Sequence, residues 1–208
     1  MSVGRVKLPV RRMRSSLFRS PYMSHLGVRH EGIVFNIFPD LVTDKFGIET
    51  WDALIERTNP ASDAIYTSGQ VYPDDELVAY VTELSNITGV AVPELIRAFG
   101  KYTMSRFKAI HSEFLDNQTA RSFLQSVHGV IHVGAKKLHP DSLLPTFDYE
   151  STADDSLTMI YSSPRKLGHL AEGLIDGVSE LFGEAIDLEH TQCMHDGAAN
   201  CRLKLRCG

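Results

Sequence analysis

The sequence predicts an α+β fold, with a mostly helical N-terminal half and a C-terminal half in which strands are mixed with helices. Through residue 138, apolar residues recur at steps of three and four, the spacing of amphipathic helices. Beyond it the period changes, and short alternating segments lie between turn residues, as strands do. The 208 residues, 43% hydrophobic and 23% charged, can build one large domain or two small subdomains.

Helices are predicted in the N-terminal half over 37–46 and 49–57, separated by Gly47, and over 74–88, 93–99 and 101–115. Asp74 and Asp75 suit the positive end of the third helix. Pro93 fits the first turn of the fourth, where its missing N–H costs nothing. Gly100 is expected to break or kink the helix around it, and residues 64–71 are ambiguous.

One long helix is predicted over 117–138, begun by a cap at Asn117 and stopped by Pro140. Its apolar stripe consists of Ala120, Phe123, Leu124, Val127, Val130 and Ile131. His128 and His132 are four residues apart and share a face that borders the stripe. The ordinary interpretation of such a histidine is a core residue bonded to a carbonyl group.

The C-terminal half is predicted to hold strands over 146–151 and 156–163, a helix over 167–182, and a hairpin over 185–194 and 200–207 around Asp196 and Gly197. An Asp-Gly pair between alternating segments is a strong hairpin signal.

Composition excludes several classes of function. The net charge of −5 gives no electrostatic case for nucleic-acid binding. No apolar run approaches the roughly 18 residues of a membrane span. The three cysteines, Cys193, Cys201 and Cys207, are too few for a disulfide scaffold and suit a reducing cytoplasm. No nucleophile motif, phosphate loop or acid pair tied to a cleft is present, so the chain is not expected to be an enzyme.

Residues 1–29 are basic and contain no acidic residue. Arg-rich, acid-free leaders can be transit peptides, but a flexible tail, or upstream sequence included by a wrong start site, is the favoured interpretation. The folded domain is therefore expected over 30–208, with a helical part over 30–115 and a mixed part over 117–208.

The segment IYSSPR carries the polar residues that stand out most. Tyr161, Ser163 and Arg165 alternate along the predicted strand and so share one face. A phenol, a hydroxyl and a guanidinium together suit a carboxylate or phosphate. Alone, the segment is ordinarily an exposed polar strand face, and Pro164 suggests the end or edge of a sheet. With an inward-facing histidine upstream, haem becomes plausible, because it needs an imidazole for iron and partners for two propionates.

The Tyr-x-Ser-x-Arg pattern, preceded by HEGIVFNIF and IHVGAKKLHPDSLLPTF, resembles the H-NOX, or haem NO-binding, domain, which is akin to the sensor domain of soluble guanylate cyclase. The resemblance runs from about Glu31 to the C-terminus. It implies haem b between the helical part and a part of antiparallel strands plus helices. His132 would ligate the iron, Pro145 would press on the porphyrin, and the propionate-binding residues would be Tyr161, Ser163 and Arg165. His128 stays a core or surface residue, with a His-x-x-x-His zinc pair as a less favoured alternative.

The same resemblance implies a distal haem wall consisting of Val34, Phe38, Thr103, Phe107, Leu170 and Leu174. Each successive pair is four residues apart, and each would serve equally well as a core pair. Oxygen-binding members carry a distal Tyr where this chain has Leu170. A hydrogen bond to bound O₂ contributes roughly 0.5–1.5 kcal/mol, more when charge-assisted. The apolar wall is therefore expected to bind NO and CO and to exclude O₂, unless the Thr103 hydroxyl donates.

The expected function is a haem-based NO sensor in which gas binding loosens His132 and so frees the central helix. No effector sequence is present, so the output would act in trans on a separate effector, a histidine kinase or a cyclic-di-GMP enzyme by family analogy. The alternative is a non-haem anion or small-molecule binding or interaction module, in which Arg165 grips another anion.

A candidate zinc site lies near the C-terminus, where His190, Cys193 and Cys201 are close enough in HTQCMHDGAANC to hold a tetrahedral ion. Some bacterial H-NOX proteins carry a Cys₃His zinc site with this arrangement, which implies a role in thiol redox sensing. The position of the first of those cysteines is Gly168 here. His169 or Cys207 could supply the fourth ligand, and the alternative is a pair of reduced thiols at the end of a hairpin.

Overall fold

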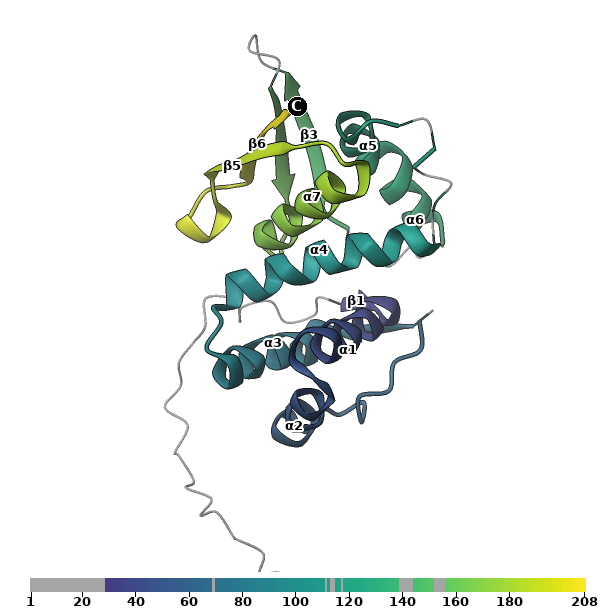
Figure 1. The fold of residues 1–208 in the computed structure, drawn as a ribbon, viewed down its shortest axis with the longest axis vertical. Coiled ribbons are helices and arrows are strands. Elements are labelled where there is room, and N and C mark those ends of the chain that lie inside the picture. The colour runs from purple at the N-terminus through teal and green to yellow at the C-terminus, as the bar shows by residue number, and fades with distance from the viewer. Residues whose placement is uncertain are drawn as a thin grey trace, which may run out of the picture.

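Two layers of secondary structure meet at a pair of packed helices, α4 and α7 (Figure 1). The computed structural model describes residues 29–208 except 69, 111, 113–114, 117, 139–143 and 152–155. The mixed α+β architecture predicted from the sequence is confirmed, with helices gathered at the N-terminal side and an antiparallel sheet at the other. Within the described segments, no helix combines the length and apolar character needed to cross a bilayer.

The N-terminal layer consists of α1 (Gly32–Phe46), α2 (Ile48–Thr58), α3 (Asp74–Thr88) and α4 (Val92–Ile110). Two short strands, β1 (Arg29–Glu31) and β2 (Val71–Pro73), pair antiparallel beside them. Their core is rich in aromatic rings, with Phe35, Phe38 and Tyr80 almost wholly buried. The predicted helices are present, although α1 begins five residues early and α4 ends at Ile110 rather than at 115.

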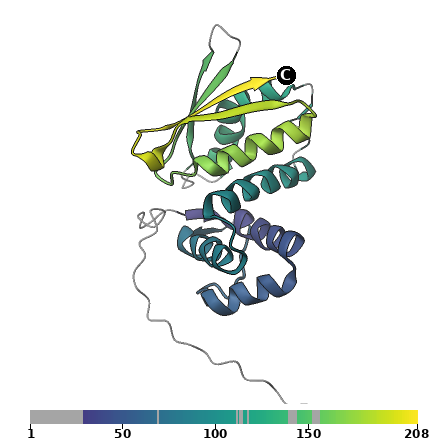
Figure 2. The ribbon, with the colours of Figure 1, turned by 60° about the vertical axis from the view of Figure 1, so that its left-hand side comes forward.

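The C-terminal layer is a four-stranded antiparallel sheet covered on one face by α7 (Gly168–Phe182) (Figure 2). In sheet order the strands are β3 (Thr146–Ser151), β4 (Leu157–Ser162), β6 (Cys201–Cys207) and β5 (Ile186–Gln192). Cys201, Leu203 and Leu205 are fully buried while the residues between them face outward, because successive side chains of a strand point to opposite faces. The predicted β5–β6 hairpin is confirmed, with Gly197 at a φ of 92° in its turn.

Helices α4 and α7 touch backbone to backbone. A Cβ atom at Gly173 would lie 1.8 Å from the Arg97 carbonyl oxygen, and one at Gly100 would lie 2.3 Å from the Leu170 carbonyl oxygen. The prediction of a break at Gly100 is therefore wrong: α4 continues through it, and the glycine permits this close approach. Arg97 on α4 also forms an ion pair with Asp176 on α7, with N···O distances of 2.6 and 2.9 Å.

The long helix predicted over 117–138 is present in three parts. They are α5 (Ala120–Ser126), the π-helical segment η2 (Val127–His132) and α6 (Val133–Leu138). Thr119 is the N-cap, because its hydroxyl accepts a 3.2 Å hydrogen bond from Ser122 N; Asn117 and Pro140 lie outside the described residues. Val130, which belongs to the predicted apolar stripe, lies in the π-helical segment and is 51% exposed.

Candidate functional site

A large apolar cavity lies where α4, α7, the π-helical segment and the sheet meet. Its volume is about 260 Å³, just below the roughly 300–1,000 Å³ that small-molecule sites typically occupy. Ten of the residues predicted for a haem site line it: His132, Pro145, Tyr161, Ser163, Arg165, Val34, Thr103, Phe107, Leu170 and Leu174. Residues more than 120 positions apart in the chain thus face one space.

Phe38 does not line this cavity, contrary to the sequence prediction. It is 1% exposed inside the N-terminal core, where its ring centroid lies 5.4 Å from that of Phe99 and 6.1 Å from that of Tyr80. Phe99 lines the cavity. Val34 and Phe38 both lie on α1, which begins five residues before the predicted helix, and α1 directs Phe38 toward its aromatic neighbours.

His132 offers a neutral imidazole to the cavity. Its Nδ1 lies 3.1 Å from the carbonyl oxygen of Pro145, and burial lowers the pKa of the ring. A carbonyl oxygen only accepts hydrogen bonds, so Nδ1 carries the proton and Nε2 keeps its lone pair. A core histidine would make the same carbonyl bond, but His132 also borders the open space, as a metal ligand oriented through its second nitrogen does.

The depressed pKa of His132 gives a testable dependence of stability on pH. The unfolded chain takes up a proton near the ordinary histidine pKa of 6.5, whereas the folded chain resists it. Ligand-free protein should therefore lose stability as the pH falls below about 6.5. We expect urea unfolding at pH 7.5 and pH 5.5 to show a smaller loss in His132→Gln than in the wild type. Equal losses of stability in the two proteins would contradict a lowered pKa of His132 in the folded chain.

A polar group forms one end of the cavity. Strand β4 ends at Ser162, so Ser163 and Arg165 lie beyond it, the latter in a turn, rather than along a strand as predicted. Both residues nevertheless line the cavity together with Tyr161. The Tyr161 hydroxyl accepts a 3.0 Å hydrogen bond from Leu167 N, and burial raises the pKa of this phenol, which stays neutral.

Arg165 brings a positive charge to this end of the cavity. Its side chain is 9% exposed, and its Nε lies 3.4 Å from an Asp74 carboxylate oxygen at the start of α3. The ion pair crosses from the sheet layer to the helical layer, a partnership that sequence spacing did not indicate. The five N–H groups of a guanidinium leave capacity for a second anion.

The rest of the cavity lining was not predicted as part of a haem site, although four of its residues belong to the predicted apolar stripe of the central helix. These remaining lining residues are Phe99, Met104, Phe123, Leu124, Val127, Ile131, Leu144, Phe147, Met159, Leu167, Ala171, Ile175 and Val178. Several repeat the helical spacing of predicted residues, as Ala171, Ile175 and Val178 do beside Leu174. That spacing could have found them as one helix face, although it cannot distinguish a cavity wall from a closed core.

The wall contributed by α1, α4 and α7 offers little to a polar ligand. Thr103 is its one hydroxyl among the lining residues that the structure describes. This hydroxyl donates a 2.8 Å hydrogen bond to the Phe99 carbonyl oxygen of its own helix. Its hydrogen is thus already engaged within α4. The remaining side chains of this wall are hydrocarbon or thioether groups.

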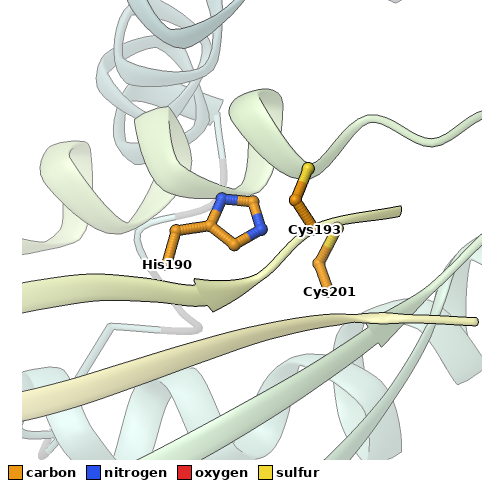
Figure 3. A group of neighbouring side chains, drawn as sticks. All are labelled: His190, Cys193 and Cys201. Carbon is orange, nitrogen blue, oxygen red and sulfur yellow. The ribbon is translucent and has the colours of Figure 1, made fainter. Parts of the chain in front are cut away.

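A second cluster lies at the β5–β6 end of the sheet, away from this wall. Figure 3 shows His190, Cys193 and Cys201 close together beside α7, and their ligand atoms all lie within 4.8 Å of one another. The Cys201 sulfur and the Glu172 carboxylate raise the pKa of His190 to about 9. Although burial opposes ionisation, His169 and His190 lower the pKa of Glu172 to about 2.

The candidates for a fourth zinc ligand lie at different distances from this cluster. A Cβ at Gly168 would lie 2.8 Å from Cys201 Sγ, so this position faces the cluster, as the sequence comparison implied. The His169 ring centroid lies 5.9 Å from that of His190. Cys207 stands opposite Ile186 at the other end of β6, and the groups of mutually close ligand atoms found in the described residues do not include it.

The family assignment rests on comparison of the sequence and the fold with known proteins. Residues 31–190 match the model of the Haem-NO-binding family. No curated protein sequence matched the chain.

Solved structures agree with this match. An H-NOX protein from S. oneidensis in the Fe(II)NO ligation state is 29% identical, with a TM-score of 0.80 over 86% of this chain and 99% of that one. Fe(II) unliganded H-NOX from K. algicida is 30% identical, with a TM-score of 0.75 over 86% and 97%. A mutant H-NOX from T. tengcongensis, 22% identical with a TM-score of 0.78 over 86% and 97%, shares the fold. The chain therefore belongs to the Haem-NO-binding, or H-NOX, family of haem-based gas-sensor domains.

Proposed function

We propose that this domain binds haem b in the apolar cavity and senses NO. The observation that carries the proposal is that a neutral imidazole, His132, and a buried guanidinium, Arg165, line the same apolar cavity. His132 would ligate the iron through Nε2 and Pro145 would pack on the porphyrin, while Tyr161, Ser163 and Arg165 would hold the propionates. Ferrous haem, when bound, supplies an iron centre that takes diatomic gases.

The cavity wall supports selectivity for NO and CO over O₂. Bound O₂ gains from a hydrogen-bond donor, whereas Leu170 provides none and the Thr103 hydroxyl is engaged by the Phe99 carbonyl. An apolar wall also excludes ordered water, which needs two to four polar partners. The distal residues would therefore disfavour O₂ because they offer it no hydrogen-bond donor.

A hydrogen-bond donor placed at position 170 should weaken the discrimination against O₂. We expect Leu170→Tyr to form a stable O₂ complex, with O₂ affinity raised about tenfold to a hundredfold, because a hydrogen bond to a charged group contributes about 1.5–3 kcal/mol. Leu170→Phe is the matched control, since it adds the same ring without the hydroxyl. O₂ titration of the reduced proteins by absorption spectroscopy measures both. Equal O₂ binding by the two variants would contradict the donor argument.

The signal would leave through the helix that carries His132. Its π-helical turn has one more residue than an α-helical turn, a feature frequent at functional sites, and Val130 and Val133 beside His132 are 51% and 44% exposed. Domains of this family are sensor modules rather than catalysts. A separate effector in the cytoplasm, a histidine kinase or a cyclic-di-GMP enzyme, would read the movement of this helix in trans.

Expression with a haem supply tests the proposal. Purified protein should show a Soret band at one haem per chain. Protein that stays colourless, while Arg165→Gln weakens binding of another anion, would instead support a non-haem anion-binding module.

We further propose that His190, Cys193 and Cys201 bind zinc, because two thiols and an imidazole lie within 4.8 Å of one another and these are preferred zinc ligands. Metal analysis under reducing conditions should find one zinc per chain. If the analysis finds no zinc, Cys193 and Cys201 are instead a pair of reduced thiols.

A further inference from the structure

Glu172 is the one carboxylate that is buried in the described part of the chain, at 6% exposure. It lies on α7 between Ala171 and Leu174, which line the apolar cavity. Burying a charge is costly unless partners surround it. An apolar residue would serve packing better at such a position, so the carboxylate needs a specific explanation.

The partners of Glu172 come from three elements. His190 on β5 donates from Nδ1 to its Oε1. Its Oε2 lies 3.2 Å from His169 Nδ1 on the same helix and 3.5 Å from Arg97 Nη1 on α4. The carboxylate thus connects the histidine of the cysteine cluster to a helix of the cavity wall.

The bond to Glu172 determines how His190 faces the cysteines. With Nδ1 turned to the carboxylate, Nε2 is buried on the side of Cys201, as Figure 3 shows for the ring and the two thiol side chains. A metal-binding histidine commonly donates its second N–H to a carboxylate, which fixes the tautomer and the ring orientation. The His190 side chain is 14% exposed and that of Glu172 is 8% exposed, so water competes little for this bond.

We propose that Glu172 is the positioning residue of a metal centre formed by His190 Nε2, Cys193 Sγ and Cys201 Sγ. This inference rests on the zinc binding proposed above. Position 168 faces the cluster but is a glycine, so it contributes no ligand atom. The centre then has three ligand side chains in place of the usual four of a structural zinc site. The orientation of His190 then matters more, and the buried carboxylate provides it. Arg97, bound to both Glu172 and Asp176, ties the centre to α4.

The test compares Glu172→Gln with Asp176→Asn in the full chain. Each substitution removes one negative charge from α7 and one carboxylate partner of Arg97. Only Glu172 contacts His190. Zinc affinity is measured by competition with a chromophoric chelator under reducing conditions, and Co²⁺ absorption reports the thiolate ligands. We expect zinc affinity about 10- to 100-fold weaker in Glu172→Gln and within about twofold of the wild type in Asp176→Asn.

A double-mutant cycle separates positioning from a general loss of structure. If Glu172 acts through His190, then Glu172→Gln adds no further loss to His190→Ala. Should Glu172→Gln fold poorly by circular dichroism, Glu172→Asp takes its place and should weaken zinc binding in the same direction. Unchanged affinity in the Glu172 variant, or an equal loss in Asp176→Asn, would overturn the positioning role alone. Wild-type protein that binds neither zinc nor Co²⁺ would overturn the metal centre itself.

Discussion

His132→Gly is expected to abolish the iron–imidazole ligation signature of the reduced, haem-loaded domain. His132 is the histidine that lines the main cavity, and its carbonyl bond to Pro145 leaves Nε2 as the free ligand nitrogen. Glycine removes that nitrogen while the apolar walls and Arg165 remain to hold a porphyrin. The variant should therefore still take up haem, with an altered Soret band, and added imidazole should restore the wild-type spectrum.

His128→Gly is the matched control for this experiment. His128 lies one turn earlier on the same π-helical segment, with its ring centroid 6.3 Å from that of His132. It lines a second hollow, which His132 and Pro145 also border, and it is not among the residues that line the main cavity. Its removal should leave the spectrum unchanged. An unaltered spectrum in His132→Gly would remove His132 from the role of iron ligand.

Gly173→Ala is expected to destabilise the fold more than any other single methyl addition considered. The new Cβ would lie 1.8 Å from the Arg97 carbonyl oxygen, far inside van der Waals contact. Because that neighbour is backbone, the helices α4 and α7 must move apart. Overpacking costs about 1–3 kcal/mol and sometimes more, so the urea midpoint should fall sharply and haem uptake should fall with it.

Gly134→Ala provides the comparison, because a Cβ there meets no atom within 4 Å. In a helix, alanine is favoured over glycine by about 1 kcal/mol, so this variant should be as stable as the wild type or more so. Equal stability of the two alanine variants would show that the α4–α7 contact is looser than described.

Sequence patterns located most regular elements, since those depend on local periodicity. Helix α3 and strand β3 have the bounds predicted for them. Gly100 was misread because its partner, α7, lies some 70 residues later in the chain, and a glycine needed for helix contact looks the same as a helix breaker. The π turn at Val127–His132 was not predicted, because the spacing of apolar residues in the sequence does not distinguish a π turn from an α-helical turn. The three-residue strands β1 and β2 depend on pairing with each other.

Most residues of the candidate site could be predicted by position from the family resemblance, but their contacts could not. His132 and Arg165 stood out because an imidazole and a guanidinium need partners when buried, and the structure brings both to one cavity. The resemblance placed Phe38 in the distal wall, and helical spacing suited a core pair equally well; the structure buries its ring in the N-terminal aromatic core. The contact of Arg165 with Asp74, and that of Glu172 with Arg97, join distant segments, which a single sequence does not reveal.

The absorption spectrum of the reduced protein, recorded alone and then with NO, CO and O₂ in turn, tests the sensor proposal most directly. We predict a Soret band that shifts with NO and with CO and stays unchanged under O₂. Protein that remains colourless after haem supply, or that forms a stable O₂ complex, would contradict the account.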